Sequence, residues 1–352
     1  MFDYQSLKNI LFKLDPEQAH SLAELAMRLG GFIPLALNPV ATRCVTLDAR
    51  LEQELFGVKF PNPVGIAAGF DKNATMVKAL SALGFGHVEY GTITPKPQNG
   101  NDKPRLFRHV AEKSLQNAMG FNNDGSIKVA KRANALYPFV IPLGANIGKN
   151  KTTPQENAIN DYVELTKIFS HYCDYIVINI SSPNTPNLRD LQNKAFVKEL
   201  FAACVPLTTK PLLLKIAPDM TPKNAIALCS AAIESGAKGI IATNTTTDYS
   251  LIPNAKNIGG ISGEALREKS FKFFSLIAKE FFGATVLISA GGISSAKEAY
   301  KRLKAGASLV QIYTSFIYEG PKIAGNINKG ILNLMDKDGF HSIKNLIGAA
   351  RN

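Results

Sequence analysis

The sequence predicts an α/β fold, a (β/α)₈ TIM barrel with an N-terminal two-helix extension. Short apolar segments recur from residue 63 onward, and amphipathic stretches separate most of them. Strands that alternate with helices pair in parallel, and eight such units close into a barrel. The eight predicted strands are residues 63–68, 87–93, 141–148, 175–181, 211–217, 239–245, 285–291 and 309–314.

The stretches between these strands carry helical patterns. Residues 73–84, 224–236 and 295–306 are amphipathic, and each ends in glycine, as helix C-termini commonly do. The interval 94–140 is longer than one helix requires. We expect it to hold a small hairpin as well as a helix.

Residues 1–42 precede the barrel and form the predicted extension, with the catalytic barrel assigned to 43–352. Leu7, Ile10, Leu11 and Leu14 repeat at helical spacing until Pro16 interrupts the pattern. The pair of helices either packs on the barrel as a cap or lies in a membrane interface as a tunnel mouth. Three Lys and Arg face four Asp and Glu in this segment, so any membrane attraction here is mainly apolar.

The chain is basic, with 40 Lys and Arg against 28 Asp and Glu and a formal charge of +12. Such a balance serves nucleic acid, an anionic membrane surface or an anionic substrate, or reflects the general composition of one organism's proteins. Nucleic acid is not favoured, because no arginine-rich run occurs and tryptophan is absent.

Cysteine usage indicates a reducing, cytosolic compartment. The four cysteines are scattered without a CxxC or Cys/His pattern, which argues against iron–sulfur and zinc sites. We expect no secretory signal, because the N-terminus lacks a basic region followed by an apolar core. No run of about 18 apolar residues is present to span a membrane.

Polar residues gather at the predicted strand ends, where barrels of this type place their active sites. The segment VINISSPNTP, residues 177–186, begins as a buried strand but also carries the amides of Asn179 and Asn184 and the hydroxyls of Ser181 and Ser182. The other strand ends carry similar groups. They include Lys72, Thr92, Asn146, Lys215, the TNTT segment 243–246, and Tyr313 with Thr314.

Lys215 lies inside an apolar strand. A buried ammonium must meet an anion or shift its pKa. Three interpretations stay open: an ion pair with a carboxylate such as Asp219, a Schiff-base lysine, or a cation beside a cofactor that becomes anionic on reduction, as a flavin does.

Glycines after the last strands indicate a phosphate-bearing cofactor. Gly263, Gly291 and Gly292 sit where backbone N–H groups commonly bind phosphate, although turns with positive φ explain them equally well. The histidines are isolated and no paired carboxylates line the strand ends, so no metal site is predicted. Acid–base work therefore falls to Ser182, the lysines or Tyr313.

The motifs, taken in order, resemble those of the quinone-dependent, membrane-associated (class 2) dihydroorotate dehydrogenases. The resemblance runs along nearly the whole chain, and ten ordered motifs are far more specific than any one of them. They are LDPEQAH, GIAAGFDKNA, YGTITPKPQNGNDKPRLFR, NAMGFNN, NIGKNK, NISSPNTP, LKIAPD, IATNTT, GGISG and LVQIYTSFIYEGP.

The resemblance implies an enzyme that oxidises (S)-dihydroorotate to orotate in pyrimidine (UMP) synthesis. It implies one FMN per chain, which takes the hydride and passes electrons to a membrane quinone, ubiquinone or menaquinone. Ser182 corresponds to the base that takes the C5 proton. Related enzymes with another electron acceptor typically have cysteine there, so the serine and the N-terminal helices both indicate the quinone class.

The resemblance also assigns site residues. The implied substrate contacts are Lys72, Asn117, Ala118, Met119, Gly120, Phe121, Asn179, Asn184, Asn244 and Thr245. The implied FMN contacts are Ala68, Gly69, Thr92, Asn146, Asn179, Lys215, Thr243, Gly263, Gly292, Tyr313 and Thr314, with Gly291 an alternative phosphate contact. His20, Arg108 and Tyr313 correspond to the inner end of a quinone funnel, although His20 also suits a helix cap or the surface.

The same resemblance implies peripheral attachment to the cytoplasmic side of the cell membrane through residues 1–42. Asn187 departs from the glycine that relatives often have there, which affects only the loop over the substrate. Three other functions are alternatives for such a barrel. They are a flavin barrel that reduces uridines in tRNA, a Schiff-base aldolase that uses Lys215 or Lys72, and a membrane-docked binding protein.

Overall fold

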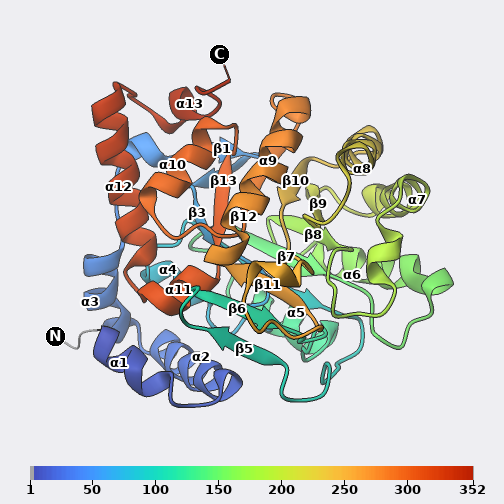
Figure 1. Ribbon diagram of the computed structural model, residues 1–352, viewed down its shortest axis with the longest axis horizontal. Helices are drawn as coiled ribbons and strands as arrows, with labels where there is room; N and C mark the ends of the chain where they lie inside the picture. The colour runs from blue at the N-terminus through green and yellow to red at the C-terminus, as the bar shows by residue number, and fades with distance from the viewer. Residues whose placement is uncertain (1–3, 352) are drawn as a thin grey trace.

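A closed barrel of eight parallel strands forms the centre of the molecule (Figure 1). The structure is a computed structural model that describes residues 4–351, apart from the side chains of residues 34–36. Each barrel strand lies within a predicted segment, which confirms the fold class. In barrel order the strands are β3 (Val64–Ile66), β4 (His87–Ile93), β7 (Leu143–Ile147), β8 (Tyr175–Asn179), β9 (Leu212–Ile216), β10 (Gly239–Ala242), β12 (Val286–Ala290) and β13 (Leu309–Ile312).

Helices surround the barrel because each buries one apolar face against it. On α7, for example, the buried residues Val197, Leu200, Phe201 and Cys204 follow the spacing of a single helical face. The surrounding helices are α4 (Val77–Ala82), α5 (Ser126–Asn134), α6 (Ala158–Phe169), α7 (Lys194–Cys204), α8 (Pro222–Glu234), α9 (Arg267–Phe281), α10 (Ala296–Lys304), α11 (Thr314–Glu319), α12 (Ile323–Asp338) and α13 (Ile343–Leu346).

The N-terminal extension is helical, as predicted, but it holds a third helix. The helices are α1 (Tyr4–Leu11), α2 (Pro16–Phe32) and α3 (Pro34–Cys44). Asp15 caps α2 by accepting hydrogen bonds from the amides of Glu17 and Gln18. Pro34 opens α3, and Pro39 lies inside it. A proline at the first position of a helix lacks only an N–H that would be unpaired anyway.

A small antiparallel sheet lies beside α2, near α1 (Figure 1). It contains the predicted hairpin of the interval 94–140, formed by β5 (Leu106–His109) and β6 (Ser114–Asn117). Its third strand, β11 (Gly260–Gly263), was not predicted, and it pairs with β6 so that Gly260 lies opposite Asn117. The sheet thus brings the GGISG segment against the NAMGF segment.

A second hairpin, β1 (Gln53–Leu55) and β2 (Val58–Phe60), packs on an apolar cluster that fills part of the barrel interior. Phe60, Tyr175 and Leu213 are fully buried members of this cluster. The main core lies between barrel and helices. Within residues 4–351, no helix combines the length and apolarity that crossing a membrane requires.

Candidate active site

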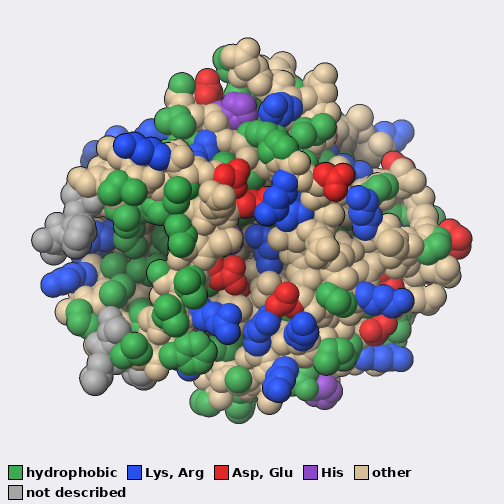
Figure 2. Space-filling view, turned by 90° about the horizontal axis from the view of Figure 1, so that it is seen from below, with side chains coloured by type: hydrophobic (Ala, Val, Ile, Leu, Met, Phe, Trp, Pro, Cys, Tyr) green, Lys and Arg blue, Asp and Glu red, His purple; other side chains and the backbone are tan. Residues whose placement is uncertain are grey.

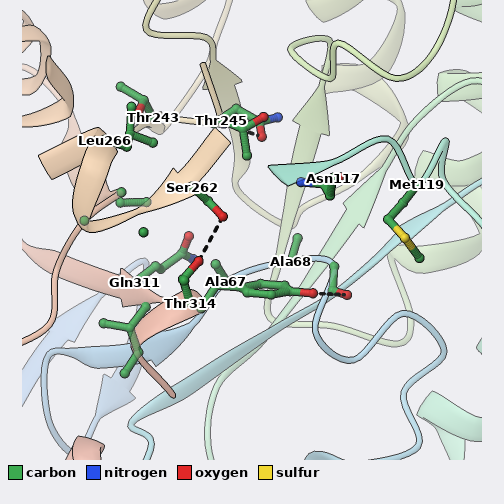
Figure 3. A pocket seen from close by; sticks show the side chains of 18 of the residues that line it. Ala67, Ala68, Asn117, Met119, Thr243, Thr245, Ser262, Leu266, Gln311 and Thr314 are labelled. Carbon is green, nitrogen blue, oxygen red and sulfur yellow. Dashed lines mark hydrogen bonds between the residues drawn. The ribbon is translucent and has the colours of Figure 1, made fainter. Parts of the chain in front are cut away.

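A cavity lies among the carboxyl ends of the barrel strands, under the small sheet (Figure 3). Most of the residues predicted for substrate and cofactor line it. They are Ala68, Gly69, Lys72, Thr92, Asn117, Met119, Gly120, Phe121, Asn179, Ser182, Asn184, Lys215, Thr243, Asn244, Thr245, Gly263, Gly292, Tyr313 and Thr314, together with Gly291.

Two predicted contacts lie behind the cavity wall. Asn146 is fully buried, and its Oδ1 accepts hydrogen bonds from Asn179 Nδ2 (3.1 Å) and Thr92 Oγ1 (2.5 Å). Ala118 is nearly buried, and its carbonyl accepts a hydrogen bond from Asn101 Nδ2 at 3.0 Å. Both residues therefore support the side chains and backbone that face the cavity.

The anion that Lys215 requires is Glu89, a fully buried residue in the middle of β4. Lys215 Nζ lies 3.1 Å from Glu89 Oε1, so pairing with Asp219 was wrong. Asp219 instead binds Arg189 at 2.8 Å and Lys269 at 2.8 Å. Burial opposes ionisation of Asp219, but the bonds from Lys269 and Thr246 hold its pKa below the usual range.

Glu89 also fixes the orientation of two amides. Its Oε1 accepts a hydrogen bond from Asn146 Nδ2, and its Oε2 accepts one from Gln311 Nε2, each at 2.6 Å. Gln311 lines the cavity, and its Oε1 is buried without a hydrogen-bond partner among the described residues. The side chain therefore leaves an acceptor for a donor on a bound ligand.

Three further polar atoms of the cavity wall have no partner within residues 4–351, Asn122 Oδ1, Thr243 Oγ1 and Asn184 Oδ1. The amide of Asn184 is oriented because its Nδ2 donates to Asn117 Oδ1 at 2.9 Å. A buried acceptor without a partner costs about 1–3 kcal/mol. The cavity is thus built for a polar ligand that supplies donors.

The segment 177–186 provides one side of this cavity. Asn179 Oδ1 accepts a hydrogen bond from Ser181 Oγ at 3.0 Å, and Ser181 Oγ accepts one from Asn244 Nδ2 at 2.9 Å. Ser182 is nearly buried, and its Oγ accepts a hydrogen bond from the backbone amide of Asn184 at 3.2 Å. The polar residues that follow the apolar strand therefore orient one another toward the cavity.

The end of the cavity between β11, β12 and α11 is rich in backbone N–H groups and hydroxyls. Ser262 Oγ and Thr314 Oγ1 lie 2.9 Å apart (Figure 3). Gly292 has a φ of +73°, and a Cβ there would lie 2.3 Å from Arg267 Cα. Only glycine fits this close approach, which leaves the backbone open to an anion.

His20 and Tyr313 line a second, smaller cavity, which shares Lys72, Met119, Asn122 and Tyr313 with the first. The ring of Phe70 contacts both His20 and Tyr313, at distances between ring centroids of 5.2 Å and 5.6 Å. Burial and the nearby Lys72 cation lower the pKa of His20 to about 3, so His20 is neutral at pH 7. Burial raises the pKa of Tyr313 to about 12.

Arg108 lies away from both cavity walls. It donates to the carbonyls of Phe12 (3.3 Å) and Leu14 (2.8 Å), and its guanidinium stacks on the Phe12 ring at 4.7 Å. These contacts hold the connection between α1 and α2 in place.

Burial lowers the pKa of Lys72, whereas the carboxylates of Glu24 and Glu17 act in the opposite direction.

Sequence reasoning missed several residues of the site. Glu89 lies within a strand, and Gln311 precedes the strand end, so neither carried the strand-end signal. Ser262 and Leu266 enter through β11 and the turn after it, which periodicity did not predict. An unexplained carboxylate in an otherwise apolar strand was the available signal for Glu89.

Fold and site together define the class of barrel enzymes that bind a small ligand at the carboxyl ends of the strands, here with groups suited to a polar ligand and an anion. A family model described as dihydroorotate dehydrogenase matches residues 50–335. The chain therefore belongs to the dihydroorotate dehydrogenase family.

Individual relatives agree over the full length. The chain is 58% identical over 346 residues to a dihydroorotate dehydrogenase (quinone) from a Nitratiruptor species, covering 98% of this chain and 99% of the relative. It is 57% identical to the enzyme of the same name from Sulfurimonas denitrificans, covering both completely. The solved structure of Eimeria tenella dihydroorotate dehydrogenase in complex with ferulenol has a TM-score of 0.88 at 36% identity, covering 96% of each chain.

Proposed function

We propose that this protein oxidises (S)-dihydroorotate to orotate through bound FMN, with Ser182 as the base and a membrane quinone as the final acceptor. Dihydroorotate oxidation with quinone as acceptor is the activity of the family class to which its full-length relatives belong. The residue assignment rests on the cavity itself. Residues of the substrate and cofactor motifs line it together, and several of their buried polar atoms have no hydrogen-bond partner among the described residues.

The cavity suits FMN at both of its ends. The Gly291–Gly292 backbone, with Ser262 and Thr314, supplies donors for a phosphate. Lys215 and the free acceptor of Gln311 suit the polar edge of the flavin ring. The chemistry that FMN supplies when bound is acceptance of the hydride that leaves C6 of the substrate.

The remaining work belongs to the chain. Lys72 provides a cation for the substrate carboxylate, and Asn117, Asn184 and Asn244 present oriented amides to its ring. Ser182 Oγ takes the C5 proton and releases its own hydroxyl proton toward solvent. The hydrogen bond from the Asn184 amide holds that oxygen in place and favours negative charge on it during the transfer.

The alternative functions have no support from the site. A tRNA-reducing barrel requires a reactive cysteine, but Cys173 is buried and donates to the Phe169 carbonyl at 3.0 Å. Burial raises the pKa of its thiol, which disfavours the reactive thiolate. The full-length match to one family likewise leaves the aldolase and the binding protein without support.

The proposal includes peripheral attachment to the cytoplasmic side of the cell membrane, with residues 1–42 forming the quinone funnel. Large apolar side chains on and just after the first two helices are exposed, and Figure 2 shows hydrophobic side chains gathered on that side. His20 and Tyr313 lie at the inner end of the funnel, beside Lys72. The exposed side chains are Leu7, Ile10, Leu22, Leu25, Leu29, Phe32 and Ile33.

Anaerobic stopped-flow absorbance tests the proposed chemistry. We expect dihydroorotate to bleach the bound flavin and a soluble quinone to restore its colour. Ser182→Ala should keep its flavin and bind orotate but lose at least about 100-fold in the rate of bleaching at neutral pH. Ser182→Cys, which keeps an ionisable proton acceptor, should retain more activity than Ser182→Ala. Near-normal bleaching by Ser182→Ala would exclude Ser182 as the base.

A further inference from the structure

An arginine at the end of the loop that precedes β5 binds helix α2. Arg105 is 7% exposed, and its guanidinium holds Glu17 of α2 with two bonds, Nη2 to Oε1 at 2.9 Å and Nε to Oε2 at 3.1 Å. A forked pair of this kind fixes orientation as well as distance. Glu17 itself is fixed, because Asp15 caps the turn that carries it.

Another edge of the same guanidinium binds the loop that precedes β5. Arg105 Nη1 donates to the carbonyls of Asn99 and Asn101, each at 2.6 Å. These bonds and the pair with Glu17 use Nε, Nη1 and Nη2 of one planar group. Because the guanidinium of Arg105 is planar and rigid, a displacement of Glu17 also displaces the backbone at Asn101.

Asn101 continues the chain of contacts into the cavity wall. Its Nδ2 donates to the carbonyls of Ala118 and Asn184, each at 3.0 Å, and its backbone amide donates to the Met119 carbonyl at 3.0 Å. At Gly120, with a φ of +75°, a Cβ would lie 2.8 Å from Asn101 Cγ, so the two segments are in close contact.

The residues at the end of this chain line the proposed substrate pocket. Asn184 and Asn117 present the paired amides, and the backbone amide of Asn184 holds Ser182 Oγ. We propose that Glu17 and Arg105 are positioning residues for dihydroorotate binding. They hold Asn101, Asn101 holds Asn184, and Asn184 contacts the substrate. This inference rests on the proposed function, and it gives α2 a role in substrate binding as well as at the quinone side.

Matched substitutions test the proposal. Glu17→Gln keeps the shape of the side chain and loses the charge, whereas Arg105→Lys keeps the charge and loses the fork. Lys103→Gln is the control, because Lys103 is 68% exposed on its side chain and its Nζ lies 3.9 Å from Glu17 Oε1. Affinity is measured by calorimetry with orotate on the flavin-loaded enzyme, and the limiting rate of flavin bleaching by stopped flow.

We expect Glu17→Gln and Arg105→Lys each to weaken orotate binding by about five- to tenfold. The limiting bleaching rate at saturating dihydroorotate should stay within about twofold, because the reacting groups themselves are unchanged. Lys103→Gln should match the wild type. The double variant Glu17→Gln/Arg105→Lys should bind no more weakly than the worse single variant, because both changes break one connection.

A second readout uses the reciprocity of binding coupling. Saturating orotate should slow amide hydrogen exchange in α2 of the wild type and should do so much less in Glu17→Gln. A general loss of structure would instead speed exchange with and without orotate, and would lower flavin content.

Each contrary outcome has a distinct meaning. Equal orotate affinity in Lys103→Gln, Glu17→Gln and Arg105→Lys overturns the proposal. Loss of affinity in Glu17→Gln alone also overturns it, because Glu17 lines the smaller cavity with Lys72 and would then act through that cation. A wild type that does not bind orotate refutes the proposed function instead.

Discussion

Glu89 illustrates how one buried carboxylate orders several residues. It is fully buried, and it accepts hydrogen bonds from Lys215, Asn146 and Gln311. These donors come from β9, β7 and β13, so the contacts meet across the barrel interior. Because an unpaired charge in such a place is very costly, the stability of the barrel depends on the pair rather than on either partner.

A double-mutant cycle on this pair measures that dependence. Glu89→Gln and Lys215→Met should each lower the free energy of unfolding by about 3–5 kcal/mol, because each leaves one buried charge unpaired. The double variant should lose markedly less than the sum of the two. Urea unfolding at a fixed flavin concentration gives these values, and strict additivity would show that the two groups do not interact.

His87 gives the protein a pH-dependent stability that is unrelated to the site. It is fully buried beside Phe60, and neither ring nitrogen has a hydrogen-bond partner in the described part of the chain. Burial lowers its pKa from 6.5 to about 3. Between these values the unfolded chain binds a proton that the folded chain excludes, so stability falls as pH falls below 6.5.

The variant His87→Leu should remove this component. Between pH 6 and pH 5, the wild type should lose about 1 kcal/mol more stability than His87→Leu, while above pH 7.5 the difference between them should not vary with pH. Urea unfolding at each pH tests this, and His20 contributes equally to both proteins. Parallel pH profiles would mean that His87 finds a proton partner in the fold.

At the residue scale, sequence reasoning found side chains that follow strands and missed those that support them. Ser182, Asn184 and Lys72 stand after apolar segments, where a polar residue is conspicuous. Glu89 and Arg105 act through partners from distant segments, at separations of 126 and 88 residues. No local pattern reports such contacts.

Helix α10 shows how an element outside the cavity shapes the cavity wall. Its Arg302 is fully buried, donates to Glu298 at 2.9 Å, and donates to Ser289 Oγ and the Gly291 carbonyl at 3.0 Å each. With the Gly291 carbonyl held from behind, the following amides are free to face the proposed phosphate end.

Substitution of Arg302 should therefore weaken the binding of FMN but not that of riboflavin. Arg302→Leu should weaken FMN binding about tenfold or more, because the phosphate loop loses its support. Riboflavin, which lacks the phosphate, should bind within about twofold of its wild-type affinity. Fluorescence titration of flavin-free protein measures both, and an equal loss for the two ligands would indicate a general structural defect.

Element prediction succeeded where a local period was present. The barrel strands follow runs of apolar residues, whereas the hairpin β5–β6 and helix α5 were expected only from the length of the interval 94–140. Helix α3 was missed because Pro34 and Pro39 indicate interruption, although the structure accommodates both. Strand β11 was missed because its four residues pair with β6 from far along the chain.

At the scale of the whole molecule, the N-terminal helices contact the barrel at both proposed ligand sites. Glu17 joins α2 to Arg105 and so to the proposed substrate side, and His20 lines the smaller cavity with Lys72 and Tyr313. Deletion of residues 1–42 should therefore impair flavin bleaching by low dihydroorotate as well as quinone reduction. At saturating dihydroorotate only quinone reduction should remain strongly impaired, provided that the truncated protein retains its flavin. Stopped flow resolves the two half-reactions, and unchanged bleaching at low substrate would contradict this expectation.

Membrane attachment depends on whether the apolar face or the overall charge of +12 dominates. Leu25 and Leu29 are 50% and 56% exposed on α2, and burying the exposed half of such a side chain in lipid contributes about 1 kcal/mol each. Leu25→Glu/Leu29→Glu should reduce sedimentation with neutral vesicles by at least about tenfold, whereas Val140→Glu, at a 78% exposed site in the loop before β7, should not. Raising the salt concentration should change wild-type binding little, because apolar contacts are not screened. Binding that requires anionic lipid and disappears in salt would instead assign attachment to the basic surface, and the helical face would lose its proposed role.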